Sequence, residues 1–452
     1  MMLLLLALGF PASTLPQPLQ EAHEESRSQE SALDWAGRFW AGDTRERRDA
    51  IAADWIAEGC LVEEVARGLR EGRTYAEDAP SGYHLTSRTA DDGTVFPYLV
   101  LIPDDYDPSR EWPLRFQLHG GMGAPAWDAS KAEWAGGWNR TSDYLMVHPA
   151  GWWDAMWWEY SQVENFEAIL RTMRATWNID EDRVLAVGNS DGGAALFFHA
   201  MRRPDRFAAW LGHVAPPDRL TRADFRPDGQ CHLLNLKDQK FLFGYGEKDK
   251  LVPIKHLRRY MELFQEFGAD LVWYALPGQG HQLDIPDARW KQFFDFMANA
   301  RRDPFPDTVS WATEDPSRYG RRSWVRVDAL GDSKEKPDGK GTQVLPRWGT
   351  SIQLRGKTVP RVPFGEVHVR REGNTVTIES RNVTRLTLLL GWPEFTWTEP
   401  IVVTWNGVVV HEGAVIPSAA TMLHWAARDD DRKRLVAAEL ALELPEPKEG
   451  SP

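Results

Sequence analysis

The sequence has little cysteine and, beyond its first residues, no long apolar run. Cys60 and Cys231 are the only cysteines in 452 residues, which excludes a disulfide framework and leaves open whether these two pair. No later stretch reaches the roughly 18 consecutive apolar residues that a membrane-spanning helix requires. We therefore expect a soluble mature protein without a stable membrane span.

The sequence also lacks an excess of positive charge. Its formal net charge is −13, and basic residues are interleaved with acidic ones in stretches such as DTRERRD and RDDDRKR. Such a chain does not attract polyanions, so nucleic acid and an anionic membrane surface are not expected as partners. We interpret the RDDDR run near the end of the chain as a solvated loop.

The N-terminus, MMLLLLALGFPASTLPQP, resembles a secretory signal, although no lysine or arginine precedes its apolar run. We predict a signal peptide at residues 1–20 and export to the periplasm or the extracellular space. The alternative is a disordered apolar leader.

Helical and strand periodicities divide the rest of the chain. Residues 31–72 carry apolar side chains at helical spacing, and we assign residues 21–78 to an N-terminal helical segment. From residue 82, short β-type runs alternate with helix-like stretches near 161–176, 192–203, 254–267 and 286–302. This alternation predicts an α/β domain at 79–303, with a mostly parallel sheet covered by helices on both faces.

The C-terminal third has a different pattern. After the linker RRDPFPDTVSW, strand-like runs follow one another without helices from about residue 304. A Gly-Asn pair in REGNTVTIE and an Asn-Gly pair in TWNGVVV indicate tight hairpins. We therefore predict an all-β, sandwich-like domain at 304–445.

The run RVLAVGNSDGGAALFFHAM offers a nucleophile. It predicts a strand, a sharp turn and a helix, which together lift Ser190 out of the sheet and direct helix N-terminal amides toward developing negative charge. The flanking glycines let the backbone turn without a Cβ clash. Gly-x-Ser-x-Gly alone is a weak motif, so the assignment depends on partners for Ser190.

A serine nucleophile needs a base and a carboxylate that orients the base, and α/β-hydrolases supply them in the chain order Ser, acid, His. The strand end FLFGYGEKDKLVP supplies Asp249, and the next, LVWYALPGQGHQLD, supplies His281. We predict the triad Ser190, Asp249 and His281, with Glu247 as the rival acid. The alternatives are a turn aspartate and a solvated loop histidine. The order excludes two other histidines, His199 and His213.

Acyl transfer also needs hydrogen-bond donors for the tetrahedral oxyanion. The loop in LRFQLHGGMG follows a strand, so we predict the backbone N–H groups of Gly121 and Asp191 as donors, with Met122 as the alternative to Gly121. The His-Gly-Gly segment would otherwise be a plain glycine turn. No spacing of His and Asp demands a metal, and we expect no cofactor.

Four short motifs, LHGG, GNSDGG, GEKDKLVP and GQGH, together resemble the secreted esterase group of the α/β-hydrolase superfamily that includes polyhydroxybutyrate-depolymerase-like and feruloyl-esterase-like enzymes. VGNSDGGAALFFHAM, PDTVSW and VTWNGVVVHEGAV are similar to exported carboxylesterase-like hydrolases with a β-rich C-terminal domain. The resemblance implies a serine hydrolase acting on small-molecule or polymer-linked esters. Asp191 departs from it, because many relatives have a smaller or apolar residue there. A carboxylate beside the serine should disfavour anionic acyl groups unless it points away.

Two other functions remain open. One is a serine peptidase resembling the prolyl oligopeptidase catalytic domain, although roughly 80 residues before the α/β domain cannot build its propeller. The other is polysaccharide or cell-surface binding through the C-terminal domain. Its segment GWPEFTWTEP would stack on sugars or, alternatively, fill the core.

Tryptophan is abundant, with 22 residues, and it concentrates in GWWDAMWWEY at 151–160. This segment follows a predicted strand at the edge where open parallel sheets bind their ligands. We predict that at least one of Trp157 and Trp158 lines the substrate cleft as an apolar wall. The i to i+4 spacing of Trp153 and Trp157 would also suit a buried helical stripe, so core packing is the alternative.

Overall fold

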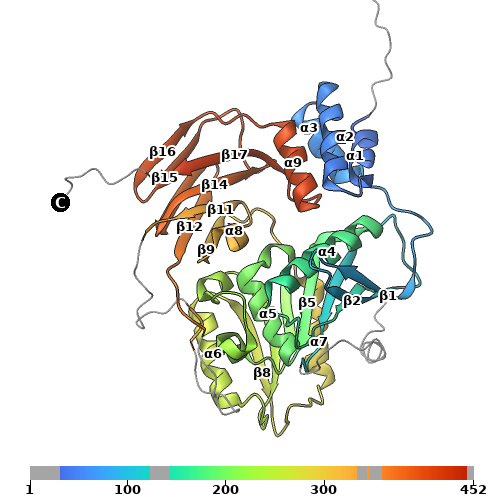
Figure 1. The fold of residues 1–452 in the computed structure, drawn as a ribbon, viewed down its shortest axis with the longest axis vertical. Helices are drawn as coiled ribbons and strands as arrows, with labels where there is room; N and C mark the ends of the chain where they lie inside the picture. The colour runs from blue at the N-terminus through green and yellow to red at the C-terminus, as the bar shows by residue number, and fades with distance from the viewer. Residues whose placement is uncertain (1–30, 123–142, 333–343, 347–358, 445–452) are drawn as a thin grey trace, which may run out of the picture. The chain divides into compact units, whose positions relative to one another are not determined.

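An eight-stranded sheet is the largest sheet of the computed structural model (Figure 1). The structure describes residues 31–122, 143–332, 344–346 and 359–444, so the predicted signal peptide lies outside the described residues. The strand order is β1-β2-β4-β3-β5-β6-β7-β8, and all neighbours from β4 to β8 pair in parallel. The strands are β1 (Gly82–Thr89), β2 (Val95–Ile102), β3 (Trp112–Leu118), β4 (Leu145–Pro149), β5 (Ile179–Asn189), β6 (Ala209–His213), β7 (Lys240–Gly246) and β8 (Asp270–Leu276).

Helices cover both faces of this sheet because alternate strand residues point to opposite sides. On one face, Val184 and Ala186 share a buried cluster with α4 (Tyr160–Thr176), α5 (Asp191–Arg202) and α6 (Ile254–Glu266). On the other face, Leu185 and Val187 share a cluster with α7 (Asp287–Asn299). The prediction of a mostly parallel α/β sheet with helices is confirmed.

Three helices precede the sheet, as the apolar spacing at 31–72 predicts: α1 (Ala32–Ala41), α2 (Arg45–Ala57) and α3 (Val62–Glu71). The rings of Trp35 and Trp55 stack with their centroids 6.3 Å apart. The apolar faces of these helices share one buried cluster with Met422 and Leu423. The N-terminal helices are therefore packed against a segment from the C-terminal third of the chain.

Two further sheets make up most of the C-terminal third, and side chains from both fill one core. Both predicted hairpins form, one at Gly373-Asn374 and one at Asn406-Gly407. Asn406 and Gly407 adopt φ of 48° and 82°, as a type I′ turn requires. The five-stranded sheet has the order β16-β15-β13-β12-β9 and the four-stranded sheet β10-β11-β14-β17. Their strands are β9 (Thr308–Thr313), β10 (Arg321–Arg322), β11 (Val325–Leu330), β12 (Gly365–Glu372), β13 (Thr375–Arg381), β14 (Val383–Gly391), β15 (Ile401–Trp405), β16 (Val408–Gly413) and β17 (Val436–Glu443).

The prediction that this third is all-β is wrong, because it contains the short helix α8 (Pro316–Tyr319) and the longer α9 (Ala419–Asp429). The Ser418 side chain caps α9 by accepting a hydrogen bond from the Thr421 N–H at 3.3 Å. The apolar stripe of α9 packs on α2 and α3. The surface that buries α9 thus comes from the opposite end of the sequence, where no local pattern reveals it.

The interpretation of RDDDR as a solvated loop is also wrong. Asp429, Asp430 and Asp431 are buried, with exposed fractions of 4%, 2% and 0%. Each carboxylate faces an arginine from a distant segment. Arg321 binds Asp429 at 2.8 Å, Arg48 binds Asp430 at 2.7 Å, and Arg302 binds Asp431 at 2.6 Å. Burial is possible because every one of these charges has an opposite partner.

Neither cysteine forms a disulfide. Cys60 is half-buried and Cys231 is buried, and both are free thiols. Burial raises the pKa of Cys231 to about 12, so this thiol stays protonated at neutral pH. Within the described residues, no helix combines the length and the apolar character needed to cross a membrane.

Candidate active site

Ser190 lies at a strained turn between β5 and α5, the position that the sequence predicts. Its φ of 53° and ψ of −119° fall outside the regions that serine ordinarily adopts. Glycine is required on both sides. A Cβ on Gly188 would lie 2.3 Å from the Gly192 carbonyl oxygen, and one on Gly192 would lie 2.4 Å from the Leu118 oxygen. The Ser190 N–H donates to the His213 carbonyl at 3.0 Å, which ties the turn to β6.

The structure brings Ser190, His281 and Asp249 into one hydrogen-bonded chain. The Ser190 hydroxyl donates to His281 Nε2 at 3.1 Å, and His281 Nδ1–H donates to Asp249 Oδ2 at 2.8 Å. Asp249 follows β7 and His281 follows β8, so both loops leave the same end of the parallel sheet as the turn at Ser190. This is the geometry that lets a histidine take the proton of a serine nucleophile.

The Asp249 carboxylate is held as an anion. Burial raises its pKa, but hydrogen bonds from His281 and from the Val252 and Leu251 amides outweigh burial and lower the pKa below its usual value. The two amides donate to Oδ1 at 2.9 and 2.8 Å, which leaves Oδ2 for the histidine. The side chain of Asp249 is fully buried, so its orientation is fixed.

The rival residues have other contacts. Glu247 is exposed and accepts a hydrogen bond from the Gly278 N–H at 2.9 Å. His199 stacks on Phe166, with ring centroids 4.2 Å apart, and its Nε2–H donates to the Trp157 carbonyl. Asp249 is therefore the acid that contacts His281.

The loop that carries the predicted oxyanion donors lies directly beside Ser190. A Cβ on Gly120 would come within 2.9 Å of the Ser190 Cβ, and Gly121 adopts a φ of 71°. Among the described residues, the Gly121 and Asp191 amides donate to no other protein group, so both N–H groups are available to an oxyanion. The Met122 amide, the alternative donor, instead donates to Asp191 Oδ2 at 3.2 Å.

The Asp191 carboxylate is not an isolated charge beside the nucleophile. Its Oδ1 lies 3.4 Å from Arg219 Nε, while its Oδ2 accepts the Met122 amide. Arg219 in turn lies over the ring of Phe225, 4.8 Å from the centroid. The repulsion of anionic acyl groups expected from Asp191 is therefore offset by Arg219.

A cavity of about 590 Å³ opens at Ser190 and His281. Its polar side carries Asp191 and Arg219. Its apolar side comes from residues that closely follow the acid and the histidine in sequence, together with two residues after β6: Leu251, Val252, Leu283, Ile285, Val214 and Pro216. Sequence reasoning missed this wall. The signal was present, because apolar side chains lie two to four positions after both Asp249 and His281.

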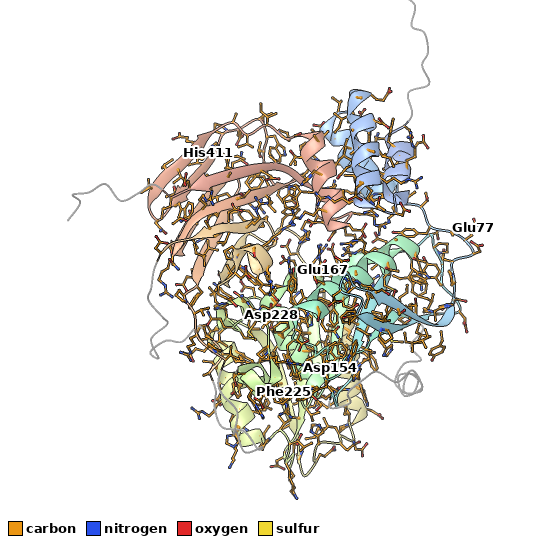
Figure 2. The ribbon with its side chains drawn as sticks, viewed as in Figure 1. Glu77, Asp154, Glu167, Phe225, Asp228 and His411 are labelled. Carbon is orange, nitrogen blue, oxygen red and sulfur yellow. The ribbon has the colours of Figure 1, made fainter. Side chains whose placement is uncertain are left out.

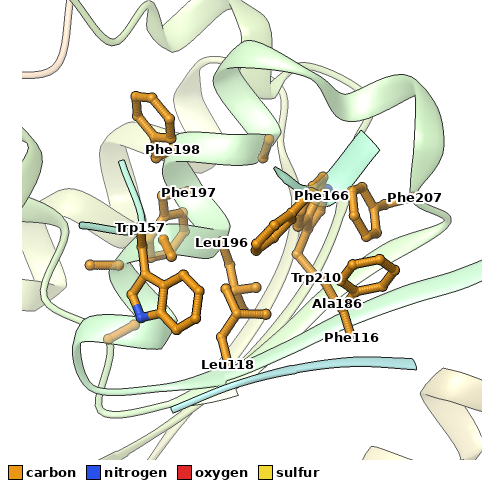
Figure 3. Packing of buried hydrophobic residues seen from close by; sticks show 14 of the residues in the cluster. Phe116, Leu118, Trp157, Phe166, Ala186, Leu196, Phe197, Phe198, Phe207 and Trp210 are labelled. Carbon is orange, nitrogen blue, oxygen red and sulfur yellow. The ribbon is translucent and has the colours of Figure 1, made fainter. Parts of the chain in front are cut away.

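Trp157 and Trp158 lie in the core and not among the cavity-lining residues, with exposed fractions of 0% and 1%. Figure 3 shows the Trp157 indole beside Leu118, against the α5 side chains that cover the sheet. The Trp157 indole N–H donates to the His119 carbonyl at 3.1 Å, and the Trp158 indole N–H donates to the Phe225 carbonyl at 2.6 Å. This placement favours packing over the cleft wall that the sequence predicted, because the turn after β4 directs both indoles inward.

The glycine-rich loop is held by this packing. Trp157 donates to the His119 carbonyl, and the Gly151 N–H donates to His119 Nε2 at 3.0 Å. Gly151 has no room for a Cβ, which would lie 2.6 Å from the Trp157 ring. The segment GWWDAMWWEY thus packs against the loop that carries Gly121 and holds it in place.

No group of three or more His, Cys, Asp or Glu within the described part of the chain is placed to hold a metal ion.

Comparisons with known proteins give only a distant likeness. No protein-family profile and no curated protein sequence matches the chain. A thermostable esterase has 18% sequence identity and a TM-score of 0.39, over 49% of this chain and 63% of its own. A putative dipeptidyl aminopeptidase IV from Bacteroides ovatus has 15% identity and a TM-score of 0.37, over 48% of this chain and 36% of its own. A CE1 ferulic acid esterase from the anaerobic fungus Anaeromyces mucronatus has 18% identity and a TM-score of 0.35, over 50% of this chain and 94% of its own.

The match covers less than two thirds of the length of the first two of these proteins. Likeness at this level assigns neither a family nor an activity to the chain. The chemistry must be argued from the side chains at Ser190.

Proposed function

We propose that this protein is a serine hydrolase that cleaves carboxylic esters through an acyl-enzyme. The observation that carries the proposal is the hydrogen-bonded chain from Ser190 Oγ to His281 Nε2 (3.1 Å) and from His281 Nδ1 to Asp249 Oδ2 (2.8 Å). A mostly parallel sheet with Ser190 in a strand–turn–helix, followed by the acid and then the histidine, agrees with an α/β-hydrolase.

In the first half of the proposed reaction, Ser190 Oγ attacks the ester carbonyl carbon and its proton passes to His281 Nε2. The carbonyl oxygen becomes an oxyanion and accepts hydrogen bonds from the Gly121 and Asp191 amides. When the tetrahedral intermediate collapses, the ester C–O bond breaks and His281 gives its proton to the leaving alcohol. Asp249 keeps the imidazole oriented and stabilises its charged form.

In the second half, His281 takes a proton from a water molecule that attacks the acyl carbon. The bond from that carbon to Ser190 Oγ then breaks, the carboxylic acid is released, and His281 returns a proton to the serine. No metal takes part in the proposed reaction.

The proposal is tested with short p-nitrophenyl esters and a fluorophosphonate label. We expect a burst of p-nitrophenol and covalent labelling of wild-type protein, both lost in Ser190→Ala. Asp249→Asn should lower kcat by about 10³-fold to 10⁴-fold, as loss of the orienting carboxylate does in such triads. Glu247→Gln is the matched control and should retain wild-type kcat, because Glu247 binds Gly278 and not His281. Wild-type turnover by Ser190→Ala would overturn the proposal.

The preference for esters over amides is tested with the same protein on a peptide-amide panel. Cleavage of peptides with kcat/KM equal to that for esters would favour the peptidase alternative. Export and glycan contact through the C-terminal sheets remain predictions. In the segment suggested for sugar stacking, Phe395 is buried, while Trp392 and Trp397 stack on each other at 5.9 Å and are partly buried against the core.

A further inference from the structure

A second cavity, of about 280 Å³, lies away from Ser190. Its lining residues come from α4, from the turn after α5, from the segment 316–326 and from the end of α9 with the residues that follow it. Eight of them are arginines and three are acids, a formal surplus of five positive charges in a chain whose net charge is −13. Glu167, one of the three acids, is labelled on α4 in Figure 2.

Five of the eight arginines have acidic partners. Arg321 makes two 2.8 Å contacts with Asp429, and Arg206 binds Glu167 at 3.1 Å. Arg434 Nε lies 3.3 Å and Arg206 Nη2 lies 3.7 Å from the same Asp429, so one carboxylate serves three guanidinium groups. The remaining two partnered arginines, Arg318 and Arg326, bind acids that do not line the cavity: Asp228 and Asp328.

The other three arginines are Arg171, Arg203 and Arg428, and no carboxylate in the described part of the chain lies within 4 Å of their guanidinium nitrogens. Arg171 and Arg428 are exposed, on α4 and α9, and Arg203 is half-buried at the end of α5. Arg203 Nη2 donates to the Arg318 carbonyl at 2.7 Å. Two buried nitrogens of the same cluster, Arg203 Nε and Arg206 Nη1, have no hydrogen-bond acceptor among the described residues, although Arg206 Nη1 lies 3.9 Å from Asp431 Oδ2. Positive charges therefore outnumber negative charges here, and N–H donors outnumber the acceptors that the protein supplies.

The titration of neighbouring groups agrees with a positive local potential. Burial raises the pKa of Glu167, but Arg206 and Arg203 outweigh it and lower the pKa to about 2. Burial lowers the pKa of Arg434 to about 9, and Arg321 and Arg206 add to this effect against the opposing Asp429. In the same cavity, burial lowers the pKa of Arg206, but Glu167, Asp429 and Asp431 outweigh burial and raise it, so the excess positive charge is carried by the arginines that have no carboxylate partner.

We propose that this cavity binds a tetrahedral oxyanion carrying at least two negative charges, a phosphate or sulfate group, through Arg171, Arg203 and Arg428. Guanidinium groups present paired N–H donors that match such oxygens. The three arginines come from three different elements, which suits an anion whose oxygens point in several directions better than a planar carboxylate. A bound anion would supply acceptors for the unsatisfied nitrogens and join α4 to α9. The proposal is independent of the chemistry at Ser190.

The test measures the melting temperature and the heat of binding of the full chain with inorganic phosphate, pyrophosphate and sulfate. Each titration is matched in ionic strength with sodium chloride. We expect at least one of these anions to raise the melting temperature by about 3 °C at a hundredfold excess over its Kd, whereas chloride does not. Sulfate equal to phosphate would define the ligand as any tetrahedral dianion. A stronger effect of phosphate or pyrophosphate would define a phosphate-bearing ligand.

The double variant Arg171→Gln, Arg428→Gln should abolish the shift and the binding heat. Both side chains are exposed and lack carboxylate partners among the described residues, so the fold should be retained. Arg67→Gln, an exposed arginine on α3 outside the cavity, is the matched control and should bind like wild type. An equal shift with sodium chloride, an equal response in the double variant, or no response to any of the three anions would each overturn the proposal.

Discussion

Asp191 accepts a hydrogen bond at 3.2 Å from the backbone amide of Met122, a residue 69 positions earlier in the chain. This contact joins the first turn of α5, next to Ser190, to the glycine-rich loop that contains Gly121. Asp191, the residue at which this sequence departs from the esterases it resembles, therefore has a structural role. It fixes one proposed oxyanion donor with respect to the nucleophile.

We expect Asp191→Ala to lower kcat by about tenfold with little change in KM, because the loop loses its tether while the cavity keeps its walls. Asp191→Asn retains an acceptor for the Met122 amide and should lose less than about threefold. Initial rates over a range of p-nitrophenyl butyrate concentrations separate kcat from KM. Identical kcat losses in the two variants would show that charge, and not the tether, is what matters.

Trp157→Ala should destabilise the protein by about 3 to 5 kcal/mol, because it removes a fully buried indole and its hydrogen bond to His119. Its relative preference among acetate, butyrate and octanoate esters should not change. Leu251→Ala is the converse case, since Leu251 is 52% exposed and lines the cavity at Ser190. That variant should keep the wild-type melting temperature and shift preference among acyl chains. If Trp157→Ala instead changed the preference among acyl chains and kept the wild-type melting temperature, Trp157 would belong to the cleft wall.

Stability should fall as the pH drops below about 6.5, partly because of His199. Burial lowers the pKa of His199 to about 3, so the folded state keeps it neutral while the unfolded state protonates it. Each pH unit between about 6.5 and 3 then favours the unfolded state by about 1 kcal/mol. The free energy of unfolding in urea at pH 7.5 and 5.5 should differ less in His199→Gln than in wild type. His424→Gln changes an exposed histidine and should leave the difference unaltered.

Asp430→Ala should destabilise the protein by about 3 to 5 kcal/mol. Asp430 lies 2.7 Å from Arg48 and 3.3 Å from Arg73, and all three side chains are buried, so the substitution leaves two charges unpaired. Asp43→Ala breaks an exposed ion pair with Arg47 and should change stability by less than about 1 kcal/mol. Thermal unfolding of the two variants side by side provides the comparison. Equal melting temperatures would exclude a structural role for the buried pair.

Local patterns predict much of the fold and the arrangement around Ser190. The turn at Ser190 is encoded within five residues, and the chain order of acid and histidine then selects Asp249 and His281. The hairpin at Asn406-Gly407 is likewise specified by the turn residues themselves.

Long-range contacts account for what the sequence did not predict. The aspartates at 429–431 look solvated because the arginines that bind them most closely lie 108, 382 and 129 residues away in the sequence. The helix α9 is not predicted from the local sequence, because the surface that buries its apolar side belongs to α2 and α3 at the other end of the chain. For Trp157, the direction of the turn after β4 decides between core and cleft, and spacing alone does not contain that direction.

The shared cluster of α1, α2, α3 and α9 has a consequence for biosynthesis. At ordinary translation rates, about 20 to 70 s separate the emergence of residue 72 from that of residue 419. During that interval, Trp55 and its neighbours lack the surface that finally buries them. We expect the earliest helices to be among the last to reach their native packing, so a nascent chain stalled before α9 should be open to proteases at its N-terminal end.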